Sequence, residues 1–414
     1  MASPTVRPLE GIRVLDLTVA LAGPYGALLL GGLGAEVIHI ETPGGGDIAR
    51  TNPPFFGRSG MSFVAQHEDD VSLSIINRGR NKKSITLDLK SEKGRAIFGD
   101  LVMQSDVIIE NMSEGVAKRL GVAYEDMSRL NPGIVYASIS AFGEPSLYPG
   151  LKGMDIIVQA LSGMMDVTGF ADGPPVRVGI PIADMVTPLY AVNGVLAALI
   201  QRGRTGKGQH VKVAMLDCLA SMLAGEHFDV SVAVGAPVRS GNSHDRLVPF
   251  GIYPCIDGHV AIVAFRPEWM KGLLNAMGRP DLNEDPRFAT RGARMLNAAA
   301  FNEVVERWTA TMRCSAVVDL LHLKHDVPAA IVRRAVDVLR DPSLYDRGAI
   351  TSLECPRQEG INAVGMGNPI QFSDANAQFD IPAETLGQSN QAVYGGILKM
   401  SSDQIEELAK TGVI

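Results

Sequence analysis

Ile12-Arg-Val-Leu-Asp-Leu17 is followed by a run of small apolar residues from Ala20 to Leu33, and then by Ala35-Glu-Val-Ile-His-Ile-Glu41. The first and last of these segments have the apolar composition of short buried strands. The run between them has the length of a helix, which Gly34 ends. A strand–helix–strand unit places two parallel strands in one sheet and packs the helix on a face of that sheet. These residues therefore predict an α/β fold.

The same alternation continues along the chain. Further strands are predicted at residues 84–89, 106–110, 134–139 and 210–214, and helices at 91–103, 115–120, 154–165, 186–202 and 215–234. Strands that alternate with helices form doubly wound parallel sheets. From about Val238 the pattern changes to polar loops, an alternating stretch at 259–263 and scattered helices, which is typical of a smaller α+β domain. We predict a large domain of residues 1–225 and 333–414 and a small domain of residues 226–332.

Composition argues against several classes of protein. The 414 residues are 46% hydrophobic and 20% charged, which is the composition of a folded globular protein. The net charge of -7 provides no basic face, so we expect no nucleic-acid partner. The four cysteines form no Cys-x-x-Cys pair, and neither an apolar leader nor a long uncharged membrane segment is visible. We expect a cytoplasmic protein with no membrane partner.

Three common active-site patterns are missing from the sequence. The turn after the first strand, Thr18-Val-Ala-Leu-Ala-Gly-Pro-Tyr-Gly26, lacks the Gly-x-Gly-x-x-Gly pattern that lets a backbone approach a dinucleotide pyrophosphate. The eight histidines are scattered and no two are four residues apart, so no metal site is expected. No Gly-x-Ser-x-Gly elbow accompanies usable Asp and His partners. The sequence therefore does not favour a dehydrogenase, a metalloenzyme or a serine hydrolase.

Asp184 stands before a long apolar helix, after Val178-Gly-Ile-Pro-Ile-Ala183. One interpretation is a helix cap, in which the carboxylate accepts a hydrogen bond from a backbone N–H. The other is a reactive carboxylate, whose ionised form the helix N-terminus would stabilise by about 0.3–1 kcal/mol. The two roles are compatible, and the position of the residue alone leaves both open.

A basic run, Asn77-Arg-Gly-Arg-Asn-Lys-Lys-Ser84, lies just before a predicted strand. One interpretation is a charged surface loop. The other is a cradle for phosphate groups, in which arginine supplies a planar fork and lysine a mobile point charge. The residue types by themselves are compatible with both interpretations.

Several segments together resemble one family. They are Pro8-Leu-Glu-Gly-Ile-Arg-Val-Leu-Asp-Leu17, Ala22-Gly-Pro24, Leu33-Gly-Ala-Glu-Val-Ile38, Asn81-Lys-Lys-Ser-Ile85, Glu110-Asn111, Asp172-Gly-Pro-Pro175, Gly194-Val-Leu-Ala-Ala-Leu199, Thr205-Gly-Lys-Gly-Gln209 and Leu408-Ala-Lys-Thr-Gly-Val-Ile414. The chain resembles the class III coenzyme A transferases, which include formyl-coenzyme A transferase, carnitine coenzyme A transferase and α-methylacyl-coenzyme A racemase. The likeness is dense over residues 8–217 and looser beyond them.

The resemblance implies a Rossmann-like large domain, a small domain and an interlocked homodimer. It implies an enzyme, a coenzyme A transferase, that binds no permanent cofactor and takes coenzyme A thioesters as substrates. It also selects Asp184 as the catalytic nucleophile, because the family's catalytic aspartate falls in the segment that matches Ile182-Ala-Asp184.

The resemblance further implies a set of coenzyme-binding residues. They are Ala20, Leu21 and Ala22 in the first turn, Arg78 with Lys82 or Lys83 facing phosphates, and Asn111, Met112, Arg119, Lys152 and Met215. The chain departs from the family at Thr42, where several relatives carry an arginine. It also departs at Ser240-Gly-Asn-Ser-His-Asp245, where no glycine-rich flap is visible.

Met154 bears on the choice of reaction. Racemases of this family carry a histidine at this position, and racemisation needs two groups that exchange a proton beside the thioester. Methionine cannot exchange a proton, so the transferase is favoured over the racemase alternative. A further alternative is one subunit of a hetero-oligomeric transferase, since some relatives work as two different subunits.

The length and the C-terminal sequence resemble the branch of the family that uses succinyl-coenzyme A with dicarboxylates. This resemblance implies an acceptor acid of about four to six carbons. The distal carboxylate of such an acid needs a cation, for which Arg177 and Arg78 are candidates. We expect Arg177 and Met154 to contact the substrate.

Overall fold

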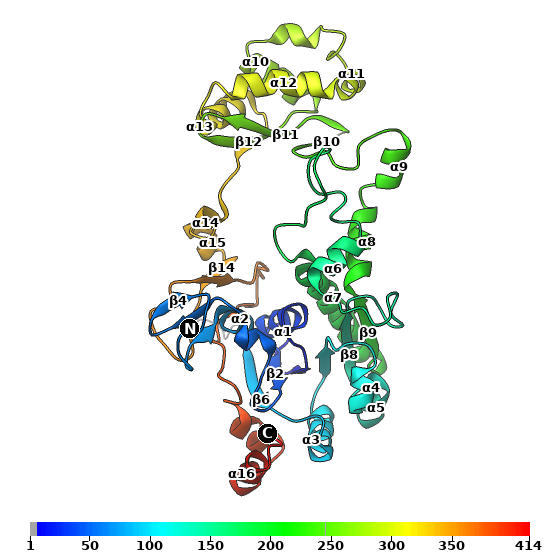
Figure 1. Ribbon diagram of the computed structural model, residues 1–414, viewed down its shortest axis with the longest axis vertical. Coiled ribbons are helices and arrows are strands. Elements are labelled where there is room, and N and C mark those ends of the chain that lie inside the picture. The colour runs from blue at the N-terminus through cyan, green and yellow to red at the C-terminus, as the bar shows by residue number, and fades with distance from the viewer. Residues whose placement is uncertain (1–5, 245) are drawn as a thin grey trace. The chain divides into compact units, whose positions relative to one another are not determined.

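The computed structural model describes residues 6–244 and 246–414 (Figure 1). Two parts of the chain lie outside the described residues. One is the first five residues, part of the stretch in which no apolar leader is visible, and the other is Asp245, which ends the 240–245 segment. The chain divides into two compact units. Unit 1 holds Met1–Ser162, Gly179–Ser221 and Asp341–Ile414, and unit 2 holds Gly163–Val178 and Met222–Arg340. Residues 163–178, 222–225 and 333–340, which the sequence assigned to the large domain, belong to the second unit.

Unit 1 is built on a six-stranded parallel sheet. In order across the sheet, its strands are β6 (Lys82–Thr86), β2 (Glu36–Glu41), β1 (Arg13–Asp16), β7 (Val107–Glu110), β8 (Val135–Ser140) and β9 (His210–Ala214). The chain adds β2 and β6 on one side of β1, and β7, β8 and β9 on the other. The predicted parallel α/β fold is confirmed. Open sheets of this kind bind ligands beyond the carboxyl ends of the strands, where the order reverses, here between β1 and β7.

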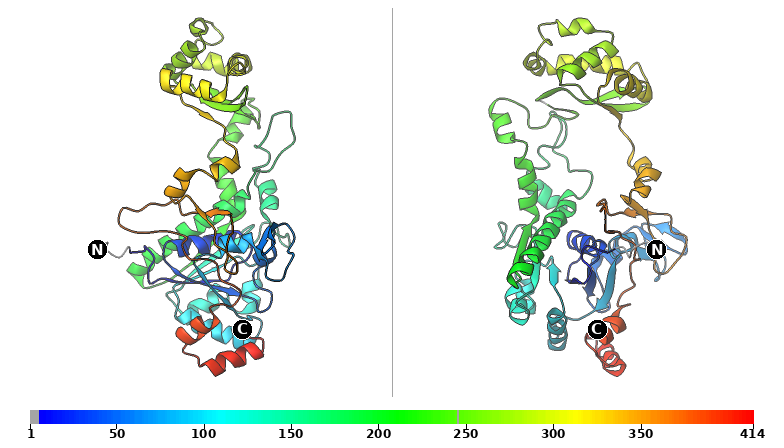
Figure 2. Two further views of the ribbon diagram at one scale, coloured as in Figure 1. Left: turned by 90° about the vertical axis from the view of Figure 1, so that its left-hand side faces the viewer. Right: turned by 180° about the vertical axis from the view of Figure 1, so that it is seen from behind.

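Helices cover both faces of this sheet (Figure 2). On one face lie α1 (Ala22–Gly32) and α7 (Ile182–Thr205), and on the other lie α3 (Glu92–Met103), α5 (Tyr124–Leu130) and α16 (Ser402–Lys410). Val14 packs into the core with α1, while the next residue, Leu15, packs into the core with α3. Successive residues of a strand point to opposite faces, so a strand buried on both faces is apolar throughout.

The C-terminal segment completes both cores of unit 1. Phe379 packs with α1 on one face, and Tyr394 packs with α3 on the other, where its hydroxyl donates to the Thr86 carbonyl oxygen at 2.7 Å. The other elements of unit 1 are the 3-10 helix η1 (Ile48–Thr51), the small antiparallel sheet of β4 (Gly60–Ser62), β3 (Phe55–Gly57) and β5 (Val71–Ser72), α2 (Leu73–Arg78), α4 (Val116–Leu120), α6 (Asp155–Leu161), α15 (Pro342–Asp346), the hairpin of β14 (Ile350–Ser352) and β15 (Val364–Met366), and the π-helix η4 (Gln391–Gly395).

Unit 2 has its own antiparallel sheet and its own core. The strands are β10 (Ser243–His244), β11 (Leu247–Cys255), β12 (Gly258–Val263) and β13 (Ala329–Ile331). The helices are α9 (Phe228–Ala233), α10 (Pro267–Ala276), η2 (Pro280–Asn283), α11 (Arg291–Leu296), α12 (Ala298–Thr309), α13 (Cys314–Val318), η3 (Asp319–Lys324) and α14 (Ala335–Val338). Val260, Phe301 and Leu321 are fully buried in this core.

One helix predicted from the sequence is interrupted. The single helix predicted at 215–234 is wrong, because α8 (Met215–Ala224) ends before Gly225, and His227 takes a left-handed φ of 53°. Among the described residues, α7 alone is long and apolar enough to cross a membrane. Its inner side is buried in the core of unit 1, and core helices of soluble proteins meet the same criterion, so α7 is weak evidence for a membrane span.

Candidate active site

The turn after β1 and the residues after β7 meet where the strand order reverses. The Val19 amide donates to Asn111 Oδ1, and Asn111 Nδ2 donates to the Val19 carbonyl oxygen, both at 2.9 Å. Ala20 follows with a φ of 70°, in the left-handed region that alanine rarely adopts. The structure thus brings together two groups of predicted coenzyme-binding residues, Ala20–Ala22 and Asn111–Met112.

The N-terminus of α1 opens from this turn without a side-chain cap, and Leu21 occupies the cap position. The first backbone N–H groups of a helix have no partner within the helix. Together with the helix dipole they attract anions such as phosphate. The turn therefore has the chemistry to receive a phosphate group or an oxyanion.

Arg78, the last residue of α2, reaches the same turn. Its Nε donates to the Ala20 carbonyl oxygen at 3.2 Å. Burial lowers the pKa of the guanidinium, while the negative charges of Asp47 and Asp184 oppose that shift. Arg78 is thus a half-buried cation close to the turn and to two carboxylates, and its contact with a phosphate stays a prediction.

Asp184 lies in the first turn of α7 but does not cap it. The cap position belongs to Pro181, and the acceptor for the free amides is Asp155, at the start of α6. Asp155 Oδ1 accepts from the Ala183 amide at 2.8 Å and from the Asp184 amide at 3.4 Å. The interpretation of Asp184 as a helix cap is therefore wrong. No residue in the described ranges donates a hydrogen bond to its carboxylate, which remains available to a ligand.

Asp155 is itself held by its neighbour on α6. Gln159 Nε2 donates to Asp155 Oδ2 at 2.6 Å, so the two carboxylate oxygens serve different helices. An acidic group at a helix N-terminus is stabilised by the free amides and by the dipole. These contacts hold the Asp155 carboxylate close to a second carboxylate, that of Asp184.

The surroundings raise the pKa of Asp184 to about 6. Burial is the largest cause and the negative charge of Asp155 the second, while Arg78 acts in the opposite direction. A carboxylate with this pKa is mostly ionised at pH 7 but poorly solvated, and shifted groups of this kind are common at catalytic sites. Asp184 therefore has the properties expected of a nucleophilic carboxylate.

The two lysines of the basic run are engaged with protein groups. Lys82 Nζ donates at 2.8 Å to both Asp16 Oδ2 and the Pro24 carbonyl oxygen, and its side chain is 2% exposed. Lys82 therefore supports the turn from inside, and the prediction that it faces a phosphate does not fit its position. Lys83 points to the opposite side of β6, where it pairs with Glu36 at 2.6 Å and stays partly exposed.

The remaining predicted residues are more dispersed. Met215 is buried, Met112 is half-buried, and Arg119 and Lys152 are exposed. Met154 is exposed at the cap position of α6, directly before Asp155. Arg177 is exposed, donates to the Val178 carbonyl oxygen and belongs to unit 2, whereas Asp184 belongs to unit 1.

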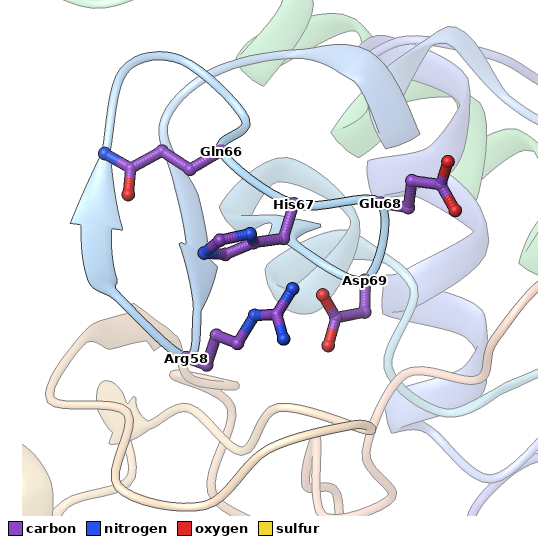
Figure 3. A pocket seen from close by; sticks show the side chains of 5 residues that line it. All are labelled: Arg58, Gln66, His67, Glu68 and Asp69. Atoms are coloured by element: carbon purple, nitrogen blue, oxygen red, sulfur yellow. The ribbon is translucent and has the colours of Figure 1, made fainter.

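A surface hollow of about 460 Å³ lies on the small sheet and is lined by Arg58, Gln66, His67, Glu68 and Asp69 (Figure 3). None of the predicted site residues lines it. Figure 3 shows the side chains of Arg58 and Asp69 turned towards each other, so the one cation of the hollow faces a carboxylate. This chemistry does not favour an anionic coenzyme there.

Sequence reasoning missed the roles of Asp155 and Asp47. Asp155 lies in the first turn of the helix predicted at 154–165, but nothing in the sequence shows that it caps another helix 28 residues later. Asp47 is 1% exposed and accepts a hydrogen bond from the Ala20 amide at 2.9 Å. The glycine run before Asp47 was a usable signal, since glycine readily takes the positive φ that Gly44 and Gly46 adopt in the turn after β2.

Fold and site together define a class of protein: a parallel α/β protein with an anion-receiving turn and a poorly solvated carboxylate close to one arginine. Residues 9–390 match the family model described as CoA-transferase family III. The chain belongs to this family and is a CoA-transferase, an enzyme whose substrates are coenzyme A thioesters. The resemblance stated from the sequence is thereby confirmed.

Named relatives cover nearly all of the chain. The succinyl-CoA:mesaconate CoA-transferase of Haloarcula hispanica is 37% identical over 88% of this chain and 90% of its own length. The succinate–glutarate CoA-transferase of Agrobacterium fabrum is 34% identical over 93% and 94%. A solved CAIB/BAIF family protein from Brucella suis is 33% identical and superposes with a TM-score of 0.79, covering 94% of this chain and 99% of that one.

Proposed function

We propose that this enzyme moves coenzyme A from succinyl-coenzyme A to a small dicarboxylic acid, with Asp184 as the covalent nucleophile. One observation carries the assignment of the nucleophile. The Asp184 carboxylate has a pKa raised to about 6 by burial and by Asp155, and no described residue donates a hydrogen bond to it. The names of the succinyl-CoA:mesaconate and succinate–glutarate relatives support the choice of donor and acceptor.

The first half of the reaction loads the enzyme. An oxygen of the Asp184 carboxylate attacks the thioester carbonyl carbon of succinyl-coenzyme A, the C–S bond breaks, and coenzyme A leaves as a thiolate. The product is a mixed anhydride between succinate and Asp184. The thiolate then attacks the aspartyl carbonyl carbon and breaks the anhydride, which releases succinate and leaves an aspartyl thioester. Covalent catalysis of this kind divides one difficult step into easier ones.

The second half repeats these steps in reverse order with the acceptor. The acceptor carboxylate attacks the aspartyl thioester, and the thiolate leaves while a second mixed anhydride forms. The thiolate then attacks the acceptor's carbonyl carbon, which frees the new thioester and restores the Asp184 carboxylate. Each tetrahedral stage carries an oxyanion, for which the uncapped amides at the start of α1 are suitable donors.

We assign recognition of the dicarboxylate's distal group to Arg78. A guanidinium binds a carboxylate through parallel hydrogen bonds. Arg78 lies close enough to Asp184 for its positive charge to oppose the upward shift of the Asp184 pKa. Arg177, the other candidate, belongs to unit 2 and stays a prediction. Met154, exposed one residue before Asp155, remains the candidate for contact with the acid's carbon chain.

The proposed assembly is a cytoplasmic homodimer. In unit 1 the outer faces of α6 and α7 expose large apolar side chains, namely Met154, Ile156, Ile157, Leu161, Leu189, Tyr190 and Ile200. Exposed apolar surface of this extent commonly marks a protein–protein interface. Light scattering of the purified chain should give twice the 44.1 kDa monomer mass, whereas a monomer that is fully active would exclude the dimer as a requirement.

Covalent labelling tests the nucleophile directly. The enzyme is mixed with succinyl-coenzyme A, quenched with hydroxylamine and digested, and its peptides are measured by mass spectrometry. The peptide that contains Asp184 should carry a hydroxamate, because hydroxylamine attacks anhydrides and thioesters. The peptide with Asp403, which also lies in the first turn of a helix, should stay unlabelled. An active enzyme whose Asp184 remains unmodified under these conditions would refute the assignment.

A panel of acids tests the substrate. Purified enzyme is supplied with succinyl-coenzyme A and with mono- and dicarboxylates of increasing length, and each product thioester is identified by mass. Dicarboxylates of about four to six carbons should react fastest, because their distal group can reach a cation. Turnover of monocarboxylates alone would contradict the proposed acceptor, and inversion of an α-methylacyl thioester would favour the racemase.

A further inference from the structure

Beneath the Ala20 turn, unit 1 buries a cluster of charged side chains. Each is at most 4% exposed, and they are Asp16, His39, Glu41, Asp47 and Lys82. Burial of charge is unfavourable unless each charge finds a partner. The pairing of these groups therefore shows what holds the turn in place.

Two of the three carboxylates have strong cationic partners. Asp16 Oδ2 lies 2.8 Å from Lys82 Nζ and 3.0 Å from His39 Nδ1. Glu41 is bound by Arg50 through two contacts of 2.6 Å, one to each carboxylate oxygen. Both groups are thus bound by a cation within hydrogen-bonding distance, whereas the third carboxylate, that of Asp47, has Arg78 only as a nearby positive charge.

Asp47 uses one oxygen to hold the backbone and leaves the other without a hydrogen bond. Its Oδ1 accepts from the Ala20 and Ala49 amides, both at 2.9 Å. Its Oδ2 is buried and has no hydrogen-bond partner among the described residues. His39 Nε2 lies 3.8 Å from this oxygen. The imidazole is therefore placed to neutralise the carboxylate that fixes the turn.

Carboxylates surround the His39 ring. The titratable groups that face it are Asp16 from β1, Glu41 from its own strand at 4.0 Å, Asp47 from the segment before η1, and Lys82 from β6. Both ring nitrogens face carboxylate oxygens, so a neutral ring would direct a lone pair at one of them. Burial lowers the pKa of His39, but Asp16 and Glu41 outweigh this effect and the net shift is upward.

We propose that His39 and Asp47 are positioning residues, in which a protonated His39 holds the Asp47 carboxylate and thereby fixes the Ala20 turn for the coenzyme. This inference rests on the proposed function, since it assigns the turn to coenzyme A. Ala20 has the left-handed φ of 70° and is held at both polar groups, by Asp47 at the amide and by Arg78 at the carbonyl. Backbone in this region is kept only where its surroundings enforce it.

The pH dependence follows from the sign of the shift. The folded state binds the His39 proton more tightly than the unfolded chain does, so this support is complete at low pH and is lost as pH rises through the folded pKa. Loss of the proton removes one of the two positive charges near Asp47 and leaves only that of Arg78, which loosens the turn. The KM for the acyl-coenzyme A should therefore rise on the alkaline side, whereas the ionisation of Asp184 acts on the acid side.

The first experiment compares His39→Gln and Asp47→Asn with the wild type across pH. His39→Gln should raise the KM for succinyl-coenzyme A about tenfold at pH 6.5, keep kcat within about threefold, and remove the alkaline rise in KM. Asp47→Asn keeps an acceptor for the Ala20 amide and removes the charge, so it should also abolish the alkaline rise. The double variant should be no worse than His39→Gln, because the two residues act as one unit.

The control is His67→Gln, a histidine on the small sheet bound to Ser59, which should leave KM and its pH dependence unchanged. NMR of ring-labelled histidine in the wild type adds a measurement that does not depend on whether the His39 variants fold. The His39 ring should titrate above the ordinary value of about 6.5. A midpoint below it, or an unchanged KM in His39→Gln, overturns this inference. An inactive wild type instead counts against the proposed function.

Discussion

The N-termini of α7 and α16 are built in different ways. At α16, Ser401 Oγ accepts from the Gln404 amide at 3.3 Å, and Gln404 Oε1 accepts from the Ser401 amide at 2.8 Å. At α7 the acceptor is Asp155, which lies on another helix. The local pair is a capping box that serves stability alone. The remote cap at α7 satisfies the helix while it leaves Asp184 free, and departures from local rules of this kind concentrate at functional sites.

The largest expected effect comes from replacing a first-turn carboxylate in each of the two helices by an amide. Asp184→Asn should lower kcat/KM by on the order of 10³-fold or more, because an amide cannot form the anhydride. Asp403→Asn, at the exposed first turn of α16, should leave kcat/KM unchanged. Steady-state assays with succinyl-coenzyme A measure both. Equal losses in the two variants would remove the distinction between the helices.

The second prediction concerns the caps. Asp155→Ala should reduce kcat by about 10- to 100-fold, because the first turn of α7 loses its anchor and Asp184 is no longer aimed. Ser401→Ala removes the corresponding cap of α16 and should leave kcat unchanged. Both variants should lose about 1 kcal/mol of unfolding free energy. A kcat for Asp155→Ala equal to that of the wild type would show that the remote cap has no catalytic role.

The third prediction is a pair of opposite shifts in the pH profile. The wild-type kcat/KM should fall about tenfold per unit below pH 6, since Asp184 must be ionised and its pKa is about 6. Asp155→Asn removes a negative neighbour and should move this acid limb to lower pH. Arg78→Gln removes a positive neighbour and should move it to higher pH. Shifts in the same direction would mean that these charges do not act on Asp184.

The smallest effect is on stability. The folded pKa of Asp184 is raised, so the ionised carboxylate costs stability above about pH 6, and this cost disappears below the ordinary aspartate pKa of 3.8. Asp184→Asn should therefore gain about 1–2 kcal/mol of unfolding free energy at pH 7.5, after allowance for partial exposure. Urea unfolding at pH 7.5 and at pH 4 measures this, and a gain of equal size at both would contradict an origin in ionisation.

Much of the fold could be predicted because its signals are local. A parallel sheet is predicted by local features alone, namely the apolar residues of β1 and β2 and the glycine that ends α1. The β4–β3–β5 sheet was missed because strands of two or three residues carry no periodicity. The break between α8 and α9 was missed because Gly225 lies within an otherwise helical pattern, where a single glycine is often tolerated.

The site was only partly predictable, for a related reason. Asp184 and Arg78 were selected by the family resemblance, because their positions alone left other interpretations open, and the use of Lys82 could not be predicted. A lysine in a basic run is normally expected to be exposed. Only the order of β6, β2 and β1 in the sheet shows that the Lys82 ammonium pairs with Asp16. Asp155 depends on a contact between two helices, and no local pattern encodes such a contact.

The C-terminal segment has a consequence for biosynthesis. Phe379 and Tyr394 fill the cores on both faces of a sheet whose last strand ends at Ala214, and the Asp88 amide donates to the carbonyl oxygen of Val413. A nascent polypeptide still lacks these residues when all six strands have left the ribosome. The cores on both faces of the sheet therefore stay incomplete until Phe379 and Tyr394, 165 and 180 residues beyond Ala214, have been translated, so a chain truncated before Phe379 should depend on chaperones.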